Sequence, residues 1–181
     1  VTRSPRSFNS QIGVPLSVWL LDKQTKLGIF EAGISQPGEM LALRDIIQPT
    51  IAVLTNLGAA HQENFTSVED KAGEKSILFH DAKTIVYPCD DEAVSSVVAS
   101  MNYGGEKLCW STKDHHAPMF VKSIEKKDTA TTITYIYNSG QENWYSIPFI
   151  DNASITCSIV CATIALRLGL ETEKLDVRMM Q

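Results

Sequence analysis

The stretch that decides the fold of this chain reads IAVLTNLGAAH and runs from Ile51 to His61. Its first part, Ile51 to Leu54, is a short apolar run without alternation, which is typical of a parallel strand covered on both faces. Asn56 follows that run, and Gly58 gives the backbone freedom to turn. Because ligands of open α/β sheets bind beyond the carboxyl ends of the strands, we expect the chemistry near Asn56 and His61.

A second segment has the same pattern. Leu27 to Phe30 is apolar and is followed by Glu31, which predicts a second buried strand beside the first. Its end would bring Glu31 close to Asn56 and His61. A carboxylate at the end of a buried strand costs free energy unless it is paired or binds a cation. An ion pair with a nearby Lys or Arg and a metal site therefore both remain open, as do a structural and a functional role for His61.

The order of the predicted elements up to about residue 116 is that of a parallel sheet with crossover helices. Helices are predicted over 15–21, 38–48, 68–79 (capped by Ser67) and 92–101, and strands over 27–31, 51–54, 84–87 and 107–110. Strands over 119–125, 131–137 and 144–150 alternate or are rich in β-branched and aromatic residues, and short hairpin connections join them. They predict an antiparallel meander packed beside the parallel sheet.

A long helix over 153–168 and a last helix capped by Thr172 complete the prediction. The fold class is α/β, with a mostly parallel sheet, flanking helices and a small antiparallel β-meander. We expect one domain over residues 1–181, truncated at its amino terminus, with a parallel α/β part over 1–116, the meander over 117–150 and the terminal helices over 151–181.

Composition excludes several classes of protein. Hydrophobic residues make up 44% of the 181 residues and charged residues 20%, which is ordinary for a globular protein. The net charge of -5 gives no electrostatic reason to expect binding to nucleic acid or to an anionic membrane. No apolar run approaches the roughly 20 residues that span a bilayer. The chain does not begin with Met and reads as part of a longer protein.

The cysteines form no Cys-x-x-Cys pair. We expect buried free thiols rather than a metal site or a disulfide, which fits a cytoplasmic location. The four are Cys89, Cys109, Cys157 and Cys161.

Lys75 has an unusual position on the predicted helix over 68–79. Spacings of four, three and four residues put four side chains on one face: Val68, Ala72, Lys75 and Phe79. Lys71 and Glu74 would point elsewhere. One explanation is a lysine that extends along its stem to water. The other is an amine held near cations, which favours its neutral form and permits reaction with carbon dioxide to a carbamate, an anionic metal ligand.

Four motifs resemble the central ATP-dependent domain of the Mur ligases. They are SFNSQIGVPLS (7–17), FEAGISQPGEM (30–40), PTIAVLTNLGAAHQENF (49–65) and EKSILF (74–79). Within that family the likeness is to the ligases that add D-Ala-D-Ala to UDP-N-acetylmuramoyl-tripeptide in peptidoglycan synthesis. The resemblance implies an amide ligase that uses ATP and Mg²⁺ and works through an acyl phosphate. It also implies a cytoplasmic protein without a nucleic-acid partner or a membrane-inserted segment.

The resemblance also implies roles for individual residues. Glu31 would match the glutamate that binds the Mg²⁺ bridging the β- and γ-phosphates of ATP. His61 would match the histidine that serves a second Mg²⁺, and Lys75 the lysine that is carbamylated to assist that ion, so both count as catalytic. Asn56 would support the phosphates, and Asn9 would lie in the segment that meets the nucleotide-sugar substrate.

The sequence departs from the family pattern in two respects. Cys157 aligns where the family usually has an asparagine for the adenine, and Asn152 is the substitute that we expect to bind ATP. The phosphate-binding motif G-x-x-x-x-G-K-[ST] does not occur in residues 1–181, where Glu74-Lys75-Ser76 lacks the glycines. We expect that loop and the two outer domains elsewhere in the full-length protein. The full-length protein could also be fused to another enzyme domain. We expect residues 1–181 alone to be inactive.

Two alternatives remain open at this point. One is a ligase-like scaffold or binding domain without catalytic activity. The other is a related amide ligase such as a folylpolyglutamate synthase, although the Pro37-Gly38-Glu39 sequence favours the ligases that add D-Ala-D-Ala.

Overall fold

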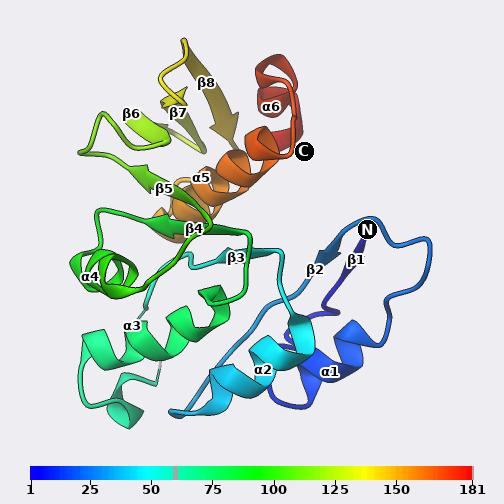
Figure 1. The fold of residues 1–181 in the computed structure, drawn as a ribbon. Coiled ribbons are helices and arrows are strands. Elements are labelled where there is room, and N and C mark those ends of the chain that lie inside the picture. Colours follow the sequence, from blue (N-terminus) through cyan, green and yellow to red (C-terminus); the bar gives the residue numbers. More distant parts are fainter. Residues whose placement is uncertain (59–60, 181) are drawn as a thin grey trace.

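A single six-stranded sheet is the centre of the molecule (Figure 1). The computed structural model describes residues 1–58 and 61–180. The strands follow one another in the sheet as they do in the chain: β3 (Ile51–Val53), β4 (Thr84–Pro88), β5 (Glu106–Ser111), β6 (Met119–Lys127), β7 (Ala130–Tyr137) and β8 (Glu142–Ile147). β3 to β6 pair in parallel, and β6 to β8 pair antiparallel. The predicted α/β class is confirmed.

The antiparallel meander continues the parallel sheet, whereas we expected it to pack beside that sheet. Trp110 and Ser111 at the end of β5 pair in parallel with Met119 and Phe120 at the start of β6. β6 then turns back into β7 through a connection in which Asp128 has a φ of 45°. The parallel and antiparallel parts therefore share one core.

Helices cover both faces of this sheet. They are α1 (Gly13–Val18), α2 (Glu39–Ile47), α3 (Val68–Ser76), α4 (Glu92–Ser100), α5 (Asn152–Arg167) and α6 (Thr172–Met179), with short 3₁₀ turns η1 (Gln62–Asn64) and η2 (Ile77–Phe79). The Ser67 hydroxyl caps α3 as predicted, by accepting from the backbone N–H of Asp70. Glu171, and not Thr172, occupies the cap position of α6.

The strand β3 is covered on both faces, as its unbroken apolar run predicted. Ala52 and Leu54 are buried in the core cluster that includes Ala72 of α3. Ile51 and Val53 pack against the other cluster, to which α5 contributes. β3 nevertheless lies at one end of the strand order, so it is an edge strand of the six.

The predicted buried strand over 27–31 is wrong. Its strand, β2, spans only Gly28–Ile29 and pairs in parallel with β1 (Thr2–Arg3) in a separate two-stranded sheet. Ile29 is 54% exposed. The backbone hydrogen bonds of this segment go to the amino terminus of the chain, because the N–H of Thr2 donates to the carbonyl of Leu27 at 2.9 Å. A short apolar run alone does not reveal which partner a strand takes.

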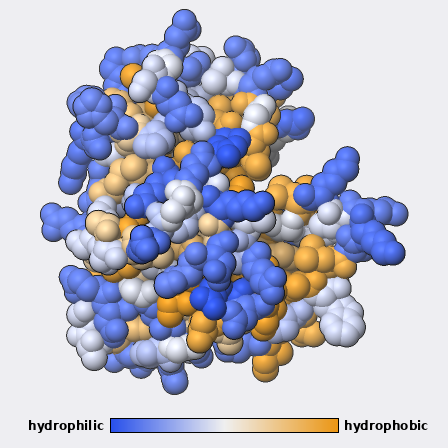
Figure 2. Space-filling view, viewed as in Figure 1, coloured by the Kyte–Doolittle hydropathy of each residue, from blue (hydrophilic) through white to orange (hydrophobic). Residues whose placement is uncertain are grey.

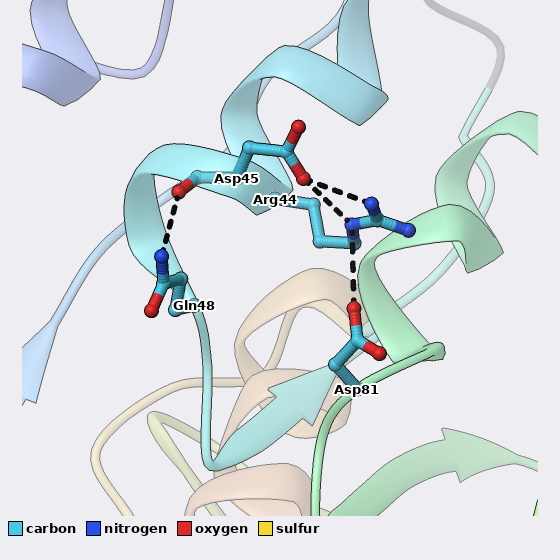
Figure 3. Close-up of polar contacts among 4 residues, drawn as sticks. All are labelled: Arg44, Asp45, Gln48 and Asp81. Carbon is cyan, nitrogen blue, oxygen red and sulfur yellow. Dashed lines mark hydrogen bonds and ion pairs between the residues drawn. The ribbon is translucent and has the colours of Figure 1, made fainter.

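An ion pair joins the helix α2 to the segment that precedes β4 (Figure 3). The Arg44 guanidinium donates to Asp45 Oδ1 at 2.8 Å and lies 3.6 Å from Asp81 Oδ2. Gln48, which closes α2 with a left-handed φ of 46°, donates its side-chain amide to the Asp45 carbonyl. The apolar packing of Met40 and Leu43 against Val14 of α1 holds α2 in place, and the exposed ion pair adds little to it.

Apolar side chains are exposed at the end of α1 and just after it, and Figure 2 shows hydrophobic surface on the side where α1 lies in Figure 1. Trp19 is 88% exposed. A shallow pocket of about 570 Å³ is lined by Pro5, Phe8, Leu16, Trp19 and Leu20. It offers no charged side chain that would orient a polar ligand. Within the described ranges, no helix has the length and hydrophobicity needed to cross a bilayer.

Candidate functional site

The carboxyl ends of the parallel strands define the edge where the expected ATP-binding residues lie. Asn56 follows the carboxyl end of β3 and is exposed. At the other edge, Arg167 at the end of α5 donates to Glu106 at the start of β5 at 2.7 Å. The helix α5 therefore runs opposite to the strands, and its first residue, Asn152, lies toward the same edge as Asn56. The Asn152 side-chain carbonyl accepts from Lys126 Nζ at 2.8 Å.

Glu31 is joined to Asn9, not to a lysine or arginine. Asn9 Nδ2 donates to Glu31 Oε1 at 2.8 Å, and the Glu31 N–H donates to Ser4 Oγ. The backbone N–H of Gly33 donates to the Asn9 carbonyl at 2.7 Å, and a Cβ at Gly33 would lie only 3.1 Å from the Asn9 side chain. Glycine thus permits this close approach.

The surroundings of Glu31 differ from the expectation in two ways. Its carboxylate is exposed, so it does not stand at the end of a buried strand. Among the ion pairs of the described residues, none includes Glu31, so the proposed ion pair with a nearby Lys or Arg is not formed. Asn9 binds one oxygen of the exposed Glu31 carboxylate. The other oxygen is therefore available to a cation.

His61 lies beside a turn that the sequence analysis did not single out as a site. It is exposed, has a left-handed φ of 59° and begins the 3₁₀ turn η1. Backbone N–H groups of Ser35 and Gln36, at 2.6 and 3.0 Å, lower the pKa of the Glu39 carboxyl, and the charge of His61 lowers it further. Asn64 donates to the Ser35 carbonyl at 2.9 Å and holds η1 against this turn. The Pro-Gly-Glu sequence was the signal that could have placed Glu39 here.

The predicted stripe on α3 is only partly right. Ala72 and Phe79 are buried, but Val68 is 45% exposed. Lys71, which we expected to point away, is 2% exposed, and its Nζ donates to the Gly58 carbonyl at 2.9 Å. Phe79 belongs to the 3₁₀ turn η2, whose residues rotate by a different angle from those of an α-helix, so it does not extend the α-helical face back to Val68.

Lys75 is partly buried. Burial lowers the pKa of its amine, and the positive charge of Lys71 lowers it further. Its neighbour Glu74 accepts from the backbone N–H of Met40 at the start of α2, at 2.9 Å. A lowered pKa gives the amine a larger neutral fraction than that of an exposed lysine, and the neutral amine is the form that reacts with carbon dioxide.

The residues of this region fit a magnesium ion that is completed by a substrate. No group of three or more His, Cys, Asp or Glu side chains in the described part of the chain could hold a metal ion by itself. Mg²⁺ usually keeps several waters and takes one or two protein carboxylates together with substrate phosphates. The exposed Glu31 carboxylate can serve in that way, and the exposed His61 can serve a second ion.

The cysteines are all free, as expected, but two of them are not buried. Cys157 and Cys161 are exposed one turn apart on α5. Cys89, just after β4, and Cys109 on β5 are partly buried and pack against the cluster that includes α4. The apolar segment around Cys157 and Cys161 favoured their burial, but the buried face of α5 is formed by other residues.

Comparison with known families finds one family model that covers most of the chain. The Mur ligase middle domain matches residues 1–165. A UDP-N-acetylmuramoyl-tripeptide--D-alanyl-D-alanine ligase from Treponema pallidum is 32% identical over 179 residues, which are 97% of this chain and 37% of that protein. The ligase of the same name from Buchnera aphidicola is 25% identical over 94% of this chain and 38% of its own length. The chain thus spans well under half of these relatives.

Solved structures share the fold. Crystal structure I of MurF from Acinetobacter baumannii has a TM-score of 0.86 at 19% identity, over 99% of this chain and 39% of that one. MurF from Thermotoga maritima in complex with ADP has a TM-score of 0.79 at 20% identity, over 96% of this chain and 41% of that one. A folylpolyglutamate synthase variant from L. casei has a TM-score of 0.68 at 16% identity, over 87% of this chain and 39% of that one.

Proposed function

Because this chain belongs to the Mur ligase middle-domain family, we propose that the full-length protein is an ATP-dependent ligase that adds D-Ala-D-Ala to UDP-N-acetylmuramoyl-tripeptide. One observation carries this proposal: relatives named for that reaction match 94% and 97% of this chain. A reaction that consumes ATP and a nucleotide sugar belongs in the cytoplasm.

The reaction has two steps. The terminal carboxylate of the tripeptide attacks the γ-phosphoryl group of ATP, which gives an acyl phosphate and ADP. The amine of D-Ala-D-Ala then attacks the acyl carbon, phosphate leaves, and the amine loses a proton as the amide forms. Bound Mg²⁺ would neutralise the negative charge that spreads over the phosphate oxygens during the transfer.

The residues of this chain would bind and orient the reactants. Glu31 would hold one Mg²⁺ ion, which would neutralise phosphate charge, and its carboxylate is oriented by the 2.8 Å bond from Asn9. His61 and a carbamylated Lys75 would hold a second ion. Carbamylation joins the neutral amine to the carbon of carbon dioxide and releases one proton.

Two asparagines at the sheet edge would bind ATP, Asn56 near the phosphates and Asn152 near the adenine. Asn9 would also meet the nucleotide-sugar substrate, next to the carboxylate that it orients. The loop that binds the phosphates would come from outside residues 1–181, as would the remaining domains and any fused enzyme.

An assay of the full-length protein tests the proposal. ADP release should require both UDP-N-acetylmuramoyl-tripeptide and D-Ala-D-Ala, and mass spectrometry should find the pentapeptide product. ADP release with a folate and glutamate instead would favour a folylpolyglutamate synthase. No turnover with either substrate pair, in a protein that is folded, would favour the scaffold.

A further inference from the structure

Lys71 is a buried cation that reaches from α3 to the loop after β3. Its side chain is 2% exposed, and Nζ donates to the Gly58 carbonyl at 2.9 Å. Gly58 stands two residues after Asn56 and three before His61. The lysine therefore contacts the backbone between two residues to which the proposed function gives roles.

Stability alone does not explain a lysine at this position. Removing an ammonium from water costs free energy, and an apolar side chain of similar length would fill the same space without that cost. The buried face of α3 otherwise consists of small residues, Ala72 and Ser76. A buried ammonium that donates to a loop carbonyl fixes the position of that loop, which a methionine could not do.

The loop itself depends on Gly58. Its φ of +58° is left-handed, and a Cβ there would lie 3.3 Å from Asn56 Oδ1. The Asn56 side chain therefore lies against the turn whose carbonyl Lys71 holds. Movement of the Gly58 carbonyl would therefore carry Asn56 with it.

We propose that Lys71 is a positioning residue for the ligase reaction, which holds the turn at Asn56 in place through the Gly58 carbonyl. The inference rests on the proposed function. It gives a role to Lys71, to which the resemblance to the Mur ligases assigned none.

The test is Lys71→Met in the full-length protein. The melting temperature should stay the same or rise, because a buried charge is removed. The turnover number should fall at least about tenfold, because a turn that is no longer held in place orients Asn56 less well toward the reactants. The Mg²⁺ concentration for half-maximal activity should rise, because Asn56, which the proposed function places near the phosphates, is displaced. A variant that unfolds, or one with normal turnover and normal Mg²⁺ dependence, would overturn the proposal.

Ser76→Ala is the matched control. Ser76 is also 2% exposed and lies on the same helix, and its hydroxyl finds no hydrogen-bond partner among the described residues. This variant should keep the turnover and the Mg²⁺ dependence of the unmodified protein. The same losses in Ser76→Ala would assign the effect to packing of α3 and would overturn the positioning role.

Hydrogen exchange separates this inference from the proposed function. Amides of peptides covering 56–65 should exchange at least about tenfold faster in Lys71→Met than in the unmodified protein, whether or not the protein is a ligase. Faster exchange in a protein without ligase activity would refute the proposed function but would still show that Lys71 restrains the loop. Unchanged exchange would show that Lys71 does not restrain the loop.

Discussion

Asn9 Nδ2 and Glu31 Oε1 are 2.8 Å apart and join segments separated by 22 residues. The bond orients an exposed carboxylate that would otherwise rotate freely. An amide donor is neutral, so it leaves the full negative charge of Glu31 for a cation, whereas a lysine partner would compete with that cation. In the proposed function, Asn9 would therefore orient Glu31 for metal binding.

The first prediction concerns this pair in the full-length protein. Glu31→Ala should abolish turnover while the fold survives, because the change removes a ligand of a cation that phosphoryl transfer requires. Asn9→Ala should lower turnover about tenfold. The two effects should not add in the double variant, because both act through one carboxylate. Rates measured at saturating Mg²⁺ test this prediction. If Glu31→Ala has the same turnover as the protein without the substitution, Glu31 has a structural role and does not bind the metal.

Glu31→Gln is the control for shape. Its side-chain carbonyl can still accept from Asn9, but it carries no charge. If the charge is what matters, Glu31→Gln should be nearly as inactive as Glu31→Ala while its melting temperature matches that of the unmodified protein.

Much of the fold could be predicted because local patterns specify it. The apolar run at Ile51 required cover on both faces, and Ser67 marked the start of α3. The change from helical spacing to alternation marked the meander. These signals depend on neighbours in the sequence, which is why the elements were found within a few residues of their ends.

Most of the errors came from partners that are distant in the sequence. Nothing in Leu27 to Phe30 specifies pairing with β1 at the amino terminus. The bond from Lys71 goes to the Gly58 carbonyl, a backbone group that no side-chain pattern reveals. One error was local, because the residue spacing does not show that a 3₁₀ turn follows α3. The bond between Asn9 and Glu31 likewise joins two residues that were expected separately.

The second prediction concerns Asp90, which links the carboxyl ends of β4 and β5. The Ser111 hydroxyl donates to Asp90 Oδ1, and the Thr112 N–H and hydroxyl both donate to Oδ2 at 2.8 Å. Burial acts to raise the pKa of this carboxyl, but the bonds from Ser111 and Thr112 outweigh burial, and its pKa lies below the ordinary 3.8. Asp90→Asn should destabilise the protein at neutral pH by about 1 to 2 kcal/mol.

The pH dependence of that difference follows from the direction of the shift. A carboxyl with a lowered folded pKa contributes its full stability above pH 3.8 and loses it as the pH falls from there through the folded value. Denaturant unfolding at several pH values should therefore show the two proteins converging in acid. A constant gap down to the lowest pH at which both fold would contradict this account.

The third prediction concerns the thiols. Cys157 and Cys161 are exposed, whereas Cys89 and Cys109 are partly buried against the α4 side of the sheet. A thiol reagent should modify the first two rapidly and the other two only on unfolding, because reaction needs an accessible thiolate. Mass spectrometry of digested protein would identify the labelled residues. Rapid labelling of Cys89 would mean that the packing of β4 against α4 is looser than described.

The last prediction concerns Lys75. Burial and the nearby charge of Lys71 both lower the pKa of its amine, so a larger fraction is neutral and able to take up carbon dioxide than for an exposed lysine. An ammonium would compete with Mg²⁺, whereas a carbamate would bind it. In the full-length protein Lys75→Ala should lose most activity, and a small carboxylic acid should partly restore it by occupying the space of the carbamate.

Lys83→Ala is the control, because Lys83 is exposed and precedes β4 at the opposite edge of the sheet. It should keep its activity and should not respond to the added acid. Normal turnover of Lys75→Ala without bicarbonate or added carboxylate would exclude the carbamate, because the second ion would then need no ligand from this position.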